Sequence, residues 1–196
     1  MITHIKGTLV EKTPTYAVID CGGVGYMIHI SLNTYSKLPE AEAPCMLYTH
    51  FAVKEDAQTL FGFSTPYERE VFRLLITVSG IGTGTARMML SSFPPEEVAA
   101  HIAAGDVAAV QSIKGIGAKT AQRVVVELKD KVLKLGVAAA NNNFTAGNKA
   151  AEEALSALVQ LGFAKPVASK AVQQVLKTEG GEHPVEDMIR LALKML

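Results

Sequence analysis

The residues best suited to chemistry form two copies of one glycine motif. Residues 78–90 read VSGIGTGTARMML and residues 113–126 read IKGIGAKTAQRVVV, so each copy has Gly-Ile-Gly, two variable residues and Thr-Ala. Glycine permits positive φ and close backbone approach. A helix, a Gly-x-Gly turn and a second helix leave unpaired amides at the start of that second helix, where the helix dipole favours an anion. A phosphate of a nucleic-acid backbone fits such a site, which reads no base.

Charge is concentrated around the second turn. The whole chain has 19 basic and 19 acidic residues, but residues 111–134 contain six basic and two acidic ones. We expect the second turn to bind more strongly because Lys114, Lys119 and Arg123 flank it, whereas the first offers mainly threonines and Arg87. The residues expected to contact DNA are Ser79, Gly80, Gly82, Thr83, Gly84, Thr85, Lys114, Gly115, Gly117, Ala118, Lys119, Thr120, Arg123 and Lys129.

Other roles for these turns, and a metal or nucleotide site elsewhere, are less well supported. The turns could be tight helix connections only, although matched duplication favours a function. Gly80-Ile81-Gly82 lacks the third glycine and preceding strand of a dinucleotide site. The chain has no Gly-Lys-Ser/Thr sequence for ATP, and its histidines and two cysteines lack metal-site spacing, so we expect no metal and no cofactor.

The elements that must position the turns follow two different patterns. Residues 1–63 contain about five short strand-like runs joined by hairpin signals, which predicts a small closed or nearly closed β barrel. Residues 64–135 follow helical spacing, and Thr65, Pro66 and Glu68 are typical of a helix start with a capping box. Duplication of only two copies favours a pseudo-twofold pair of helical hairpins over a solenoid.

The last third of the chain indicates a tethered module. Residues 136–148 carry no charge and are rich in small residues and Asn, which predicts a flexible linker. Residues 149–196 predict three short helices, interrupted at Gly162 and at Gly180-Gly181. The N-terminus lacks a signal-like region and no apolar run approaches a membrane span, so we expect a cytoplasmic protein with no membrane partner.

These motifs and their order resemble the RuvA family of Holliday junction-binding proteins. The most specific pieces are Phe61-Gly62-Phe63, Lys54-Glu55-Asp56 and the second turn, residues 115–121. The resemblance covers essentially the whole chain. It implies an α+β multidomain fold with an OB-type barrel (1–63), a tandem helix-hairpin-helix domain (64–135) and a UBA-like three-helix domain (149–196).

The resemblance also implies partners and further site residues. Family members form homotetramers, alone or as face-to-face pairs, that hold a four-way DNA junction open, and Glu55 and Asp56 map onto the acidic pin near the tetramer centre. The third domain would bind the hexameric ATPase RuvB, with Leu161, Gly162 and Phe163 as candidate contacts, and the RuvC resolvase is an expected partner. The chain would itself be non-catalytic.

Departures from the family pattern affect the expected affinity. Thr83-Gly84 stands where relatives often have a lysine, Ala118-Lys119 has one lysine where two are common, and Lys54 stands where relatives carry arginine. Two alternatives stay open: a duplex-binding scaffold without junction preference, and a helix-hairpin-helix nuclease or glycosylase. The second is disfavoured because the acidic pairs lie at helix starts and the helical part has few aromatic residues for a base pocket.

Overall fold

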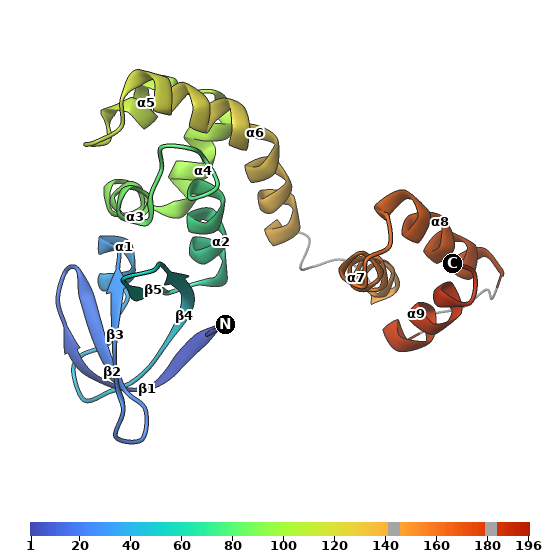
Figure 1. The fold of residues 1–196 in the computed structure, drawn as a ribbon, viewed down its shortest axis with the longest axis horizontal. Coiled ribbons are helices and arrows are strands. Elements are labelled where there is room, and N and C mark those ends of the chain that lie inside the picture. The colour runs from blue at the N-terminus through green and yellow to red at the C-terminus, as the bar shows by residue number, and fades with distance from the viewer. Residues whose placement is uncertain (141–145, 179–183) are drawn as a thin grey trace. The chain divides into compact units, whose positions relative to one another are not determined.

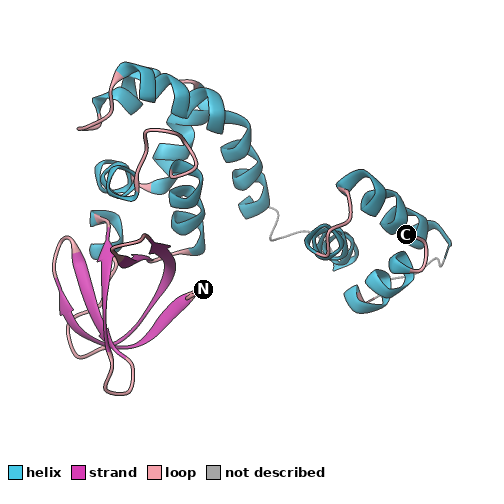
Figure 2. Ribbon diagram, viewed as in Figure 1, coloured by secondary structure: helices cyan, strands magenta, loops and turns pink. Residues whose placement is uncertain are grey.

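The computed structural model describes residues 1–140, 146–178 and 184–196. They form two compact units, Met1–Ala139 and Ala140–Leu196. Strands are confined to the start of the first unit, and helices make up the rest of both units (Figure 2). Each unit is described by itself below.

The N-terminal strands close into a five-stranded barrel, which confirms the predicted OB-type fold. Neighbouring strands follow the order β1-β2-β3-β5-β4, and β4 returns to pair with β1 (Figure 1). All pairs are antiparallel except β3 with β5. The bounds are β1 (His4–Lys12), β2 (Tyr16–Asp20), β3 (Gly25–Ile30), β4 (Pro44–Val53) and β5 (Gln58–Phe63).

A four-residue helix that the sequence analysis missed follows the third strand. This helix, α1 (Leu32–Tyr35), begins after Ser31, whose side chain accepts a hydrogen bond from the Thr34 amide. It lies between the barrel and α3 (Figure 1). The helix therefore belongs to the junction between the strands and the helices that follow.

Five helices complete the first unit, and side chains cap two of them, α2 and α5. Asp106 caps α5 by accepting from the Ala109 amide, and α4 ends at Gly105 in the left-handed conformation, with φ 81°. The bounds are α2 (Pro66–Leu75), α3 (Thr83–Ser92), α4 (Pro95–Ala104), α5 (Val107–Ser112) and α6 (Ala118–Ala140).

The capping box predicted for α2 is only half present. Thr65 caps the helix by accepting from the Glu68 amide at 3.1 Å, as expected. The Glu68 carboxylate does not return to the Thr65 amide. It accepts instead from Ser31 and Thr34 beside the barrel and from Ser64. The reciprocal half of the box was wrong because the carboxylate found partners more than thirty residues away in sequence.

The barrel has its own apolar core, and the core of the tandem helices extends onto the outside of strand β5. Leu60 faces the barrel interior, whereas Phe61 and Phe63 face outward and join the helical core. Their ring centroids lie 5.3 and 4.9 Å from that of Phe72 on α2. The predicted boundary at residues 63 and 64 therefore coincides with the end of β5, but the helical core already includes Phe61 and Phe63 on the barrel side of it.

The second unit is a three-helix bundle consisting of α7 (Ala146–Gln160), α8 (Lys165–Thr178) and α9 (Val185–Leu193). Gly162 lies in the turn between α7 and α8 and has the left-handed backbone conformation, with φ 101°. The predicted linker, residues 136–148, is helical at both described ends because α6 reaches Ala140 and α7 begins at Ala146. Residues 141–145 and the expected break at Gly180-Gly181 lie outside the described residues.

Candidate nucleic-acid interface

Each Gly-Ile-Gly segment makes the same turn between two helices. The first glycine of each copy has positive φ, 95° at Gly80 and 92° at Gly115. The isoleucine that follows is buried in both copies. Its amide donates back across the turn, from Ile81 to the Val78 carbonyl at 3.0 Å and from Ile116 to the Ile113 carbonyl at 3.1 Å. The predicted duplication is therefore also a duplication of local geometry.

The helices that follow the turns begin with backbone amides free for a ligand. Gly82 is the N-cap of α3, and no side-chain hydrogen bond caps this helix. The first amide to bond back is that of Ala86, to the Gly82 carbonyl, and Ala121 bonds in the same way to Gly117. The preceding amides of each first turn point out with the positive end of the helix dipole, which suits an anion.

The second glycine of each copy is not required by the chain's own packing. Neither Gly82 nor Gly117 has positive φ, and a Cβ built on either would have no heavy atom within 4 Å. Gly84 on α3 is equally open. A tight helix connection explains Gly80 and Gly115 but does not explain these three positions, whereas close approach of an external group does.

The two turns lie next to each other. A Cβ on Gly80 would lie 3.6 Å from the Thr120 Oγ1 in the first turn of α6. Arg123, one turn further along α6, donates from Nη1 to the Ser79 carbonyl at 3.3 Å, and its Nε lies 3.5 Å from Glu127 Oε1. Arg123 therefore belongs to the second motif by sequence but lies at the first turn in space.

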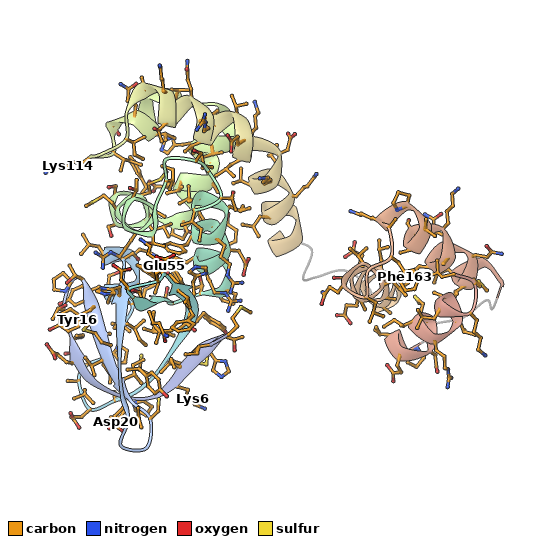
Figure 3. All side chains as sticks on the ribbon, in the orientation of Figure 1. Lys6, Tyr16, Asp20, Glu55, Lys114 and Phe163 are labelled. Atoms are coloured by element: carbon orange, nitrogen blue, oxygen red, sulfur yellow. The ribbon has the colours of Figure 1, made fainter. Side chains whose placement is uncertain are left out.

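The lysines predicted for DNA contact are exposed and available. Lys114 lies at the tip of the second turn (Figure 3), Lys119 lies in the first turn of α6, and Lys129 follows further along that helix. Within the described part of the chain, no acidic side chain forms an ion pair with any of them. Their charge is thus not neutralised by an ion pair with any residue that the structure describes.

Arg87 has a different role from the one expected for it. Its Nη1 donates to the Thr15 carbonyl at 3.1 Å and lies 3.2 Å from the His29 Nδ1, so this side chain joins α3 to the barrel. Burial lowers the pKa of His29, and the adjacent Arg87 lowers it further. The first turn is therefore left without Arg87 as a cation, which makes the position of Arg123 more important.

The remaining predicted site residues lie in two places, on the barrel hairpin and at the two helix starts. Glu55 and Asp56 are exposed at the β4–β5 hairpin, which is closed by the Lys54 amide donating to Ala57 at 2.8 Å (Figure 3). Thr83, Thr85 and Ala118 complete the two helix starts. No group of His, Cys, Asp or Glu in the described ranges could hold a metal ion.

The candidate partner contacts in the second unit differ in exposure. Leu161 is 63% exposed after α7, whereas Phe163 is partly buried against the bundle core (Figure 3). Gly162, between them, has the left-handed backbone. Leu161 is thus free to meet another molecule, and Phe163 contributes to packing. Among the helices described, none combines the length and apolar character needed to cross a membrane.

Comparison with known proteins agrees with this architecture. Family models match three consecutive parts of the chain: "RuvA N terminal domain" at residues 1–62, "SAM-like Helix-hairpin-helix tandem" at 72–130 and "RuvA, C-terminal domain" at 149–196. A curated protein of Christiangramia forsetii is 57% identical over the full length of both chains. The chain belongs to the RuvA family.

Other RuvA relatives match just as completely. Proteins of Flavobacterium psychrophilum and Bacteroides thetaiotaomicron are 50% and 47% identical over the full length of both chains. All three relatives are named "Holliday junction branch migration complex subunit RuvA". The RuvA family assignment confirms the resemblance seen in the sequence and accounts for the order of barrel, helical hairpins and C-terminal bundle.

Proposed function

We propose that this chain binds four-way DNA junctions without sequence preference, through backbone phosphates held at the two glycine turns. The observation that carries the proposal is the glycine at 82 and 117, where the subunit's own packing leaves open space and ordinary φ. A Cβ at these positions would occupy the space that a phosphate oxygen needs to reach the helix amides. Lys114 and Lys119 add attraction at the second turn, and Arg123 adds it beside the first.

The acidic hairpin gives the proposal its junction specificity. Glu55 and Asp56 are exposed and lie beyond the end of the barrel strands. In a fourfold homotetramer four such hairpins would meet at the crossover, and two tetramers facing each other across the DNA would bring four from each side. Their carboxylates would repel phosphates there and separate the strands, while the glycine turns hold the duplex arms.

The proposed role is non-catalytic. Strand exchange would be driven by a separate hexameric ATPase, RuvB, which binds the C-terminal bundle through exposed apolar residues that include Leu161. The RuvC resolvase is a further proposed partner on the same junction. The setting would be recombination and repair in the cytoplasm.

A gel-shift competition tests the function directly. Labelled four-way junction and labelled linear duplex of the same arm sequence are titrated with the full chain, with and without Mg²⁺, against excess unlabelled duplex. We expect the junction complex to persist and the linear complex to be competed away. Equal competition of both complexes would replace the proposal with a duplex-binding scaffold.

Two further readouts test the remaining alternatives. Incubation of the junction with Mg²⁺ should leave both strands at full length, and cleavage would instead support a nuclease. Light scattering of the free protein should give the mass of a tetramer or of two tetramers, and a stable monomer would contradict the fourfold arrangement. Leu161→Asp should weaken RuvB binding without weakening junction binding, because the two sites lie in different compact units.

A further inference from the structure

Glu68 is the one fully buried charged residue among those described, and it is not one of the residues proposed to contact DNA. It lies in the first turn of α2 and is 0% exposed. Its carboxylate accepts from the Ser31 hydroxyl at 2.6 Å and from the Thr34 hydroxyl at 2.8 Å. It also accepts from the Ser64 hydroxyl at 3.1 Å and from the Ser64 amide at 3.3 Å.

The donors come from the junction between barrel and helices. Ser31 directly follows the last residue of β3 and caps α1, and Thr34 lies within that helix. The same short helix meets α3 from its other side, where the Leu32 amide donates to the Ser91 hydroxyl at 3.1 Å. Helix α1 is thus held between α2 and α3 by hydrogen bonds, and Glu68 supplies the acceptors on the α2 side.

A buried carboxylate is an unusual way to attach two apolar surfaces. The contact of Phe61 and Phe63 with Phe72 already joins barrel and helices, and apolar attraction has little directional preference. Burying a carboxylate is unfavourable unless hydrogen bonds compensate, as four do here. The two hydrogen bonds from Ser31 and Thr34 join α1 to α2 and do have directional preference, so they fix an angle that the aromatic contact alone would leave loose.

We propose that Glu68 is a positioning residue that fixes the angle between the barrel and the tandem helices, and thereby determines preference for a junction over linear duplex. The inference rests on the proposed function. A linear duplex needs only the glycine turns, which lie on the helices. A junction must meet the turns and the Glu55-Asp56 hairpin at once, in every subunit, so a loose angle weakens junction binding selectively.

Two substitutions separate the hydrogen-bond geometry from the charge. Glu68→Gln keeps the length and an acceptor, and the hydroxyls of Ser31 and Thr34 can rotate to accept from its amide. Glu68→Met keeps the volume but removes both acceptors. Ile102→Ala, a fully buried core position on α4 that makes no hydrogen bond to α1, serves as the control for destabilisation alone.

The main readout is the ratio of junction to duplex affinity, measured well below the unfolding temperature of every variant. We expect Glu68→Met to lower this ratio at least tenfold while duplex affinity changes less than twofold. Glu68→Gln and Ile102→Ala should keep the ratio within twofold of wild type. An unchanged ratio in Glu68→Met, or an equal fall in Ile102→Ala, would overturn the proposal.

If Glu68→Met does not fold, Thr34→Val provides a milder test. Valine has nearly the shape of threonine and removes one of the four donors to Glu68. The expected fall in the affinity ratio is about threefold, in the same direction. A Thr34→Val chain that folds and keeps the wild-type ratio would count against the proposal as directly as the first variant.

A distance measurement tests the positioning step without any DNA. Spin labels are placed on exposed barrel and helix positions, Met27 and Leu133, after Cys21 and Cys45 have been replaced, and labelled chains are diluted into unlabelled protein. Glu68→Met should broaden the distance distribution, whereas Glu68→Gln should not. Equal widths would refute the positioning role. Equal binding of both DNAs by wild type would instead refute the proposed function, and the widths would still decide the role of Glu68.

Discussion

The glycines at 82 and 117 offer the sharpest test of the phosphate-binding turns. The perturbation is the double substitution Gly82→Ala and Gly117→Ala. Both sites have open space for a methyl group and ordinary φ, so the fold should accept it. Alanine is a poorer N-cap than glycine but restricts the unfolded chain, and these opposing effects of up to about 1 kcal/mol each nearly cancel.

The effect on DNA binding should be much larger than the effect on stability. A methyl group at each helix start would keep a phosphate from approaching the amides, and a hydrogen bond to a charged group contributes about 1.5–3 kcal/mol. At about 1.4 kcal/mol per factor of ten, one lost bond lowers affinity roughly 10- to 150-fold. The assay is junction titration by fluorescence anisotropy at fixed salt, beside urea unfolding of the same samples.

A matched control comes from the same helix. Gly136 also has open space for a Cβ, but it lies near the far end of α6. Gly136→Ala should raise stability by about 0.5–1 kcal/mol because alanine suits a helix interior, and should leave junction affinity unchanged. Unaltered affinity in the Gly82→Ala, Gly117→Ala chain would refute the reasoning, because the open glycines would then have no bound group to accommodate.

Four other variants test separate parts of the structure. Lys119→Gln should lessen the slope of log affinity against log salt by about 0.9 for each subunit on the DNA, as a salt titration would measure. Leu161→Asp should weaken RuvB binding in calorimetry and leave the junction titration unchanged, because a 63% exposed side chain contributes little to the bundle core. Glu42 has the left-handed backbone conformation, with φ 66°, which costs a non-glycine residue about 1 kcal/mol. Glu42→Gly should remove this cost and raise the urea midpoint of unfolding. Burial lowers the pKa of His29 and of His50 below the ordinary 6.5. At a pH near or below 6.5 the unfolded chain therefore binds more protons than the folded chain, and the free energy of unfolding falls as the pH drops from about 7. Replacing both histidines with Gln should flatten this fall in urea titrations between about pH 5 and 7.

Much of the fold could be predicted because its signals are local. The strand-like runs of residues 1–63 and the cap at Thr65 depend on neighbours within a few positions, and the structure confirms them. The positive φ expected of a glycine turn is present at Gly80 and Gly115 for the same reason. The RuvA family resemblance added the OB type of the barrel, which no local pattern specifies.

The parts that could not be predicted depend on distant partners. Helix α1 has four residues, too few for a period, although Ser31 followed by Thr34 is a cap signal that a closer search could have found. Two partners of the Glu68 carboxylate, Thr34 and Ser31, lie 34 and 37 residues away, so the capping-box pattern pointed to the wrong hydrogen-bond donor. Arg87 was expected at the first turn for its position in sequence, but α3 directs it to the barrel.

The helix ends around the predicted linker show a different limit. Absence of charge in residues 136–148 indicated a flexible segment, yet the run of alanines up to Ala140 continues α6. Alanine has the highest helix propensity, and a helix already packed along its earlier turns extends at little further cost. Composition alone therefore placed the start of the linker too early.

The aromatic contact across the barrel wall has a consequence for how the chain is assembled and can be cut. Because Phe61 and Phe63 complete the core that contains Phe72, ribosomal release of the barrel alone would expose two large aromatic faces until α2 emerged. Residues 1–139 should therefore behave as one foldon in hydrogen exchange, with amides of β5 and α2 opening together. The first position at which the chain can be divided into a fragment that folds by itself therefore lies beyond α6, not at the change from strands to helices.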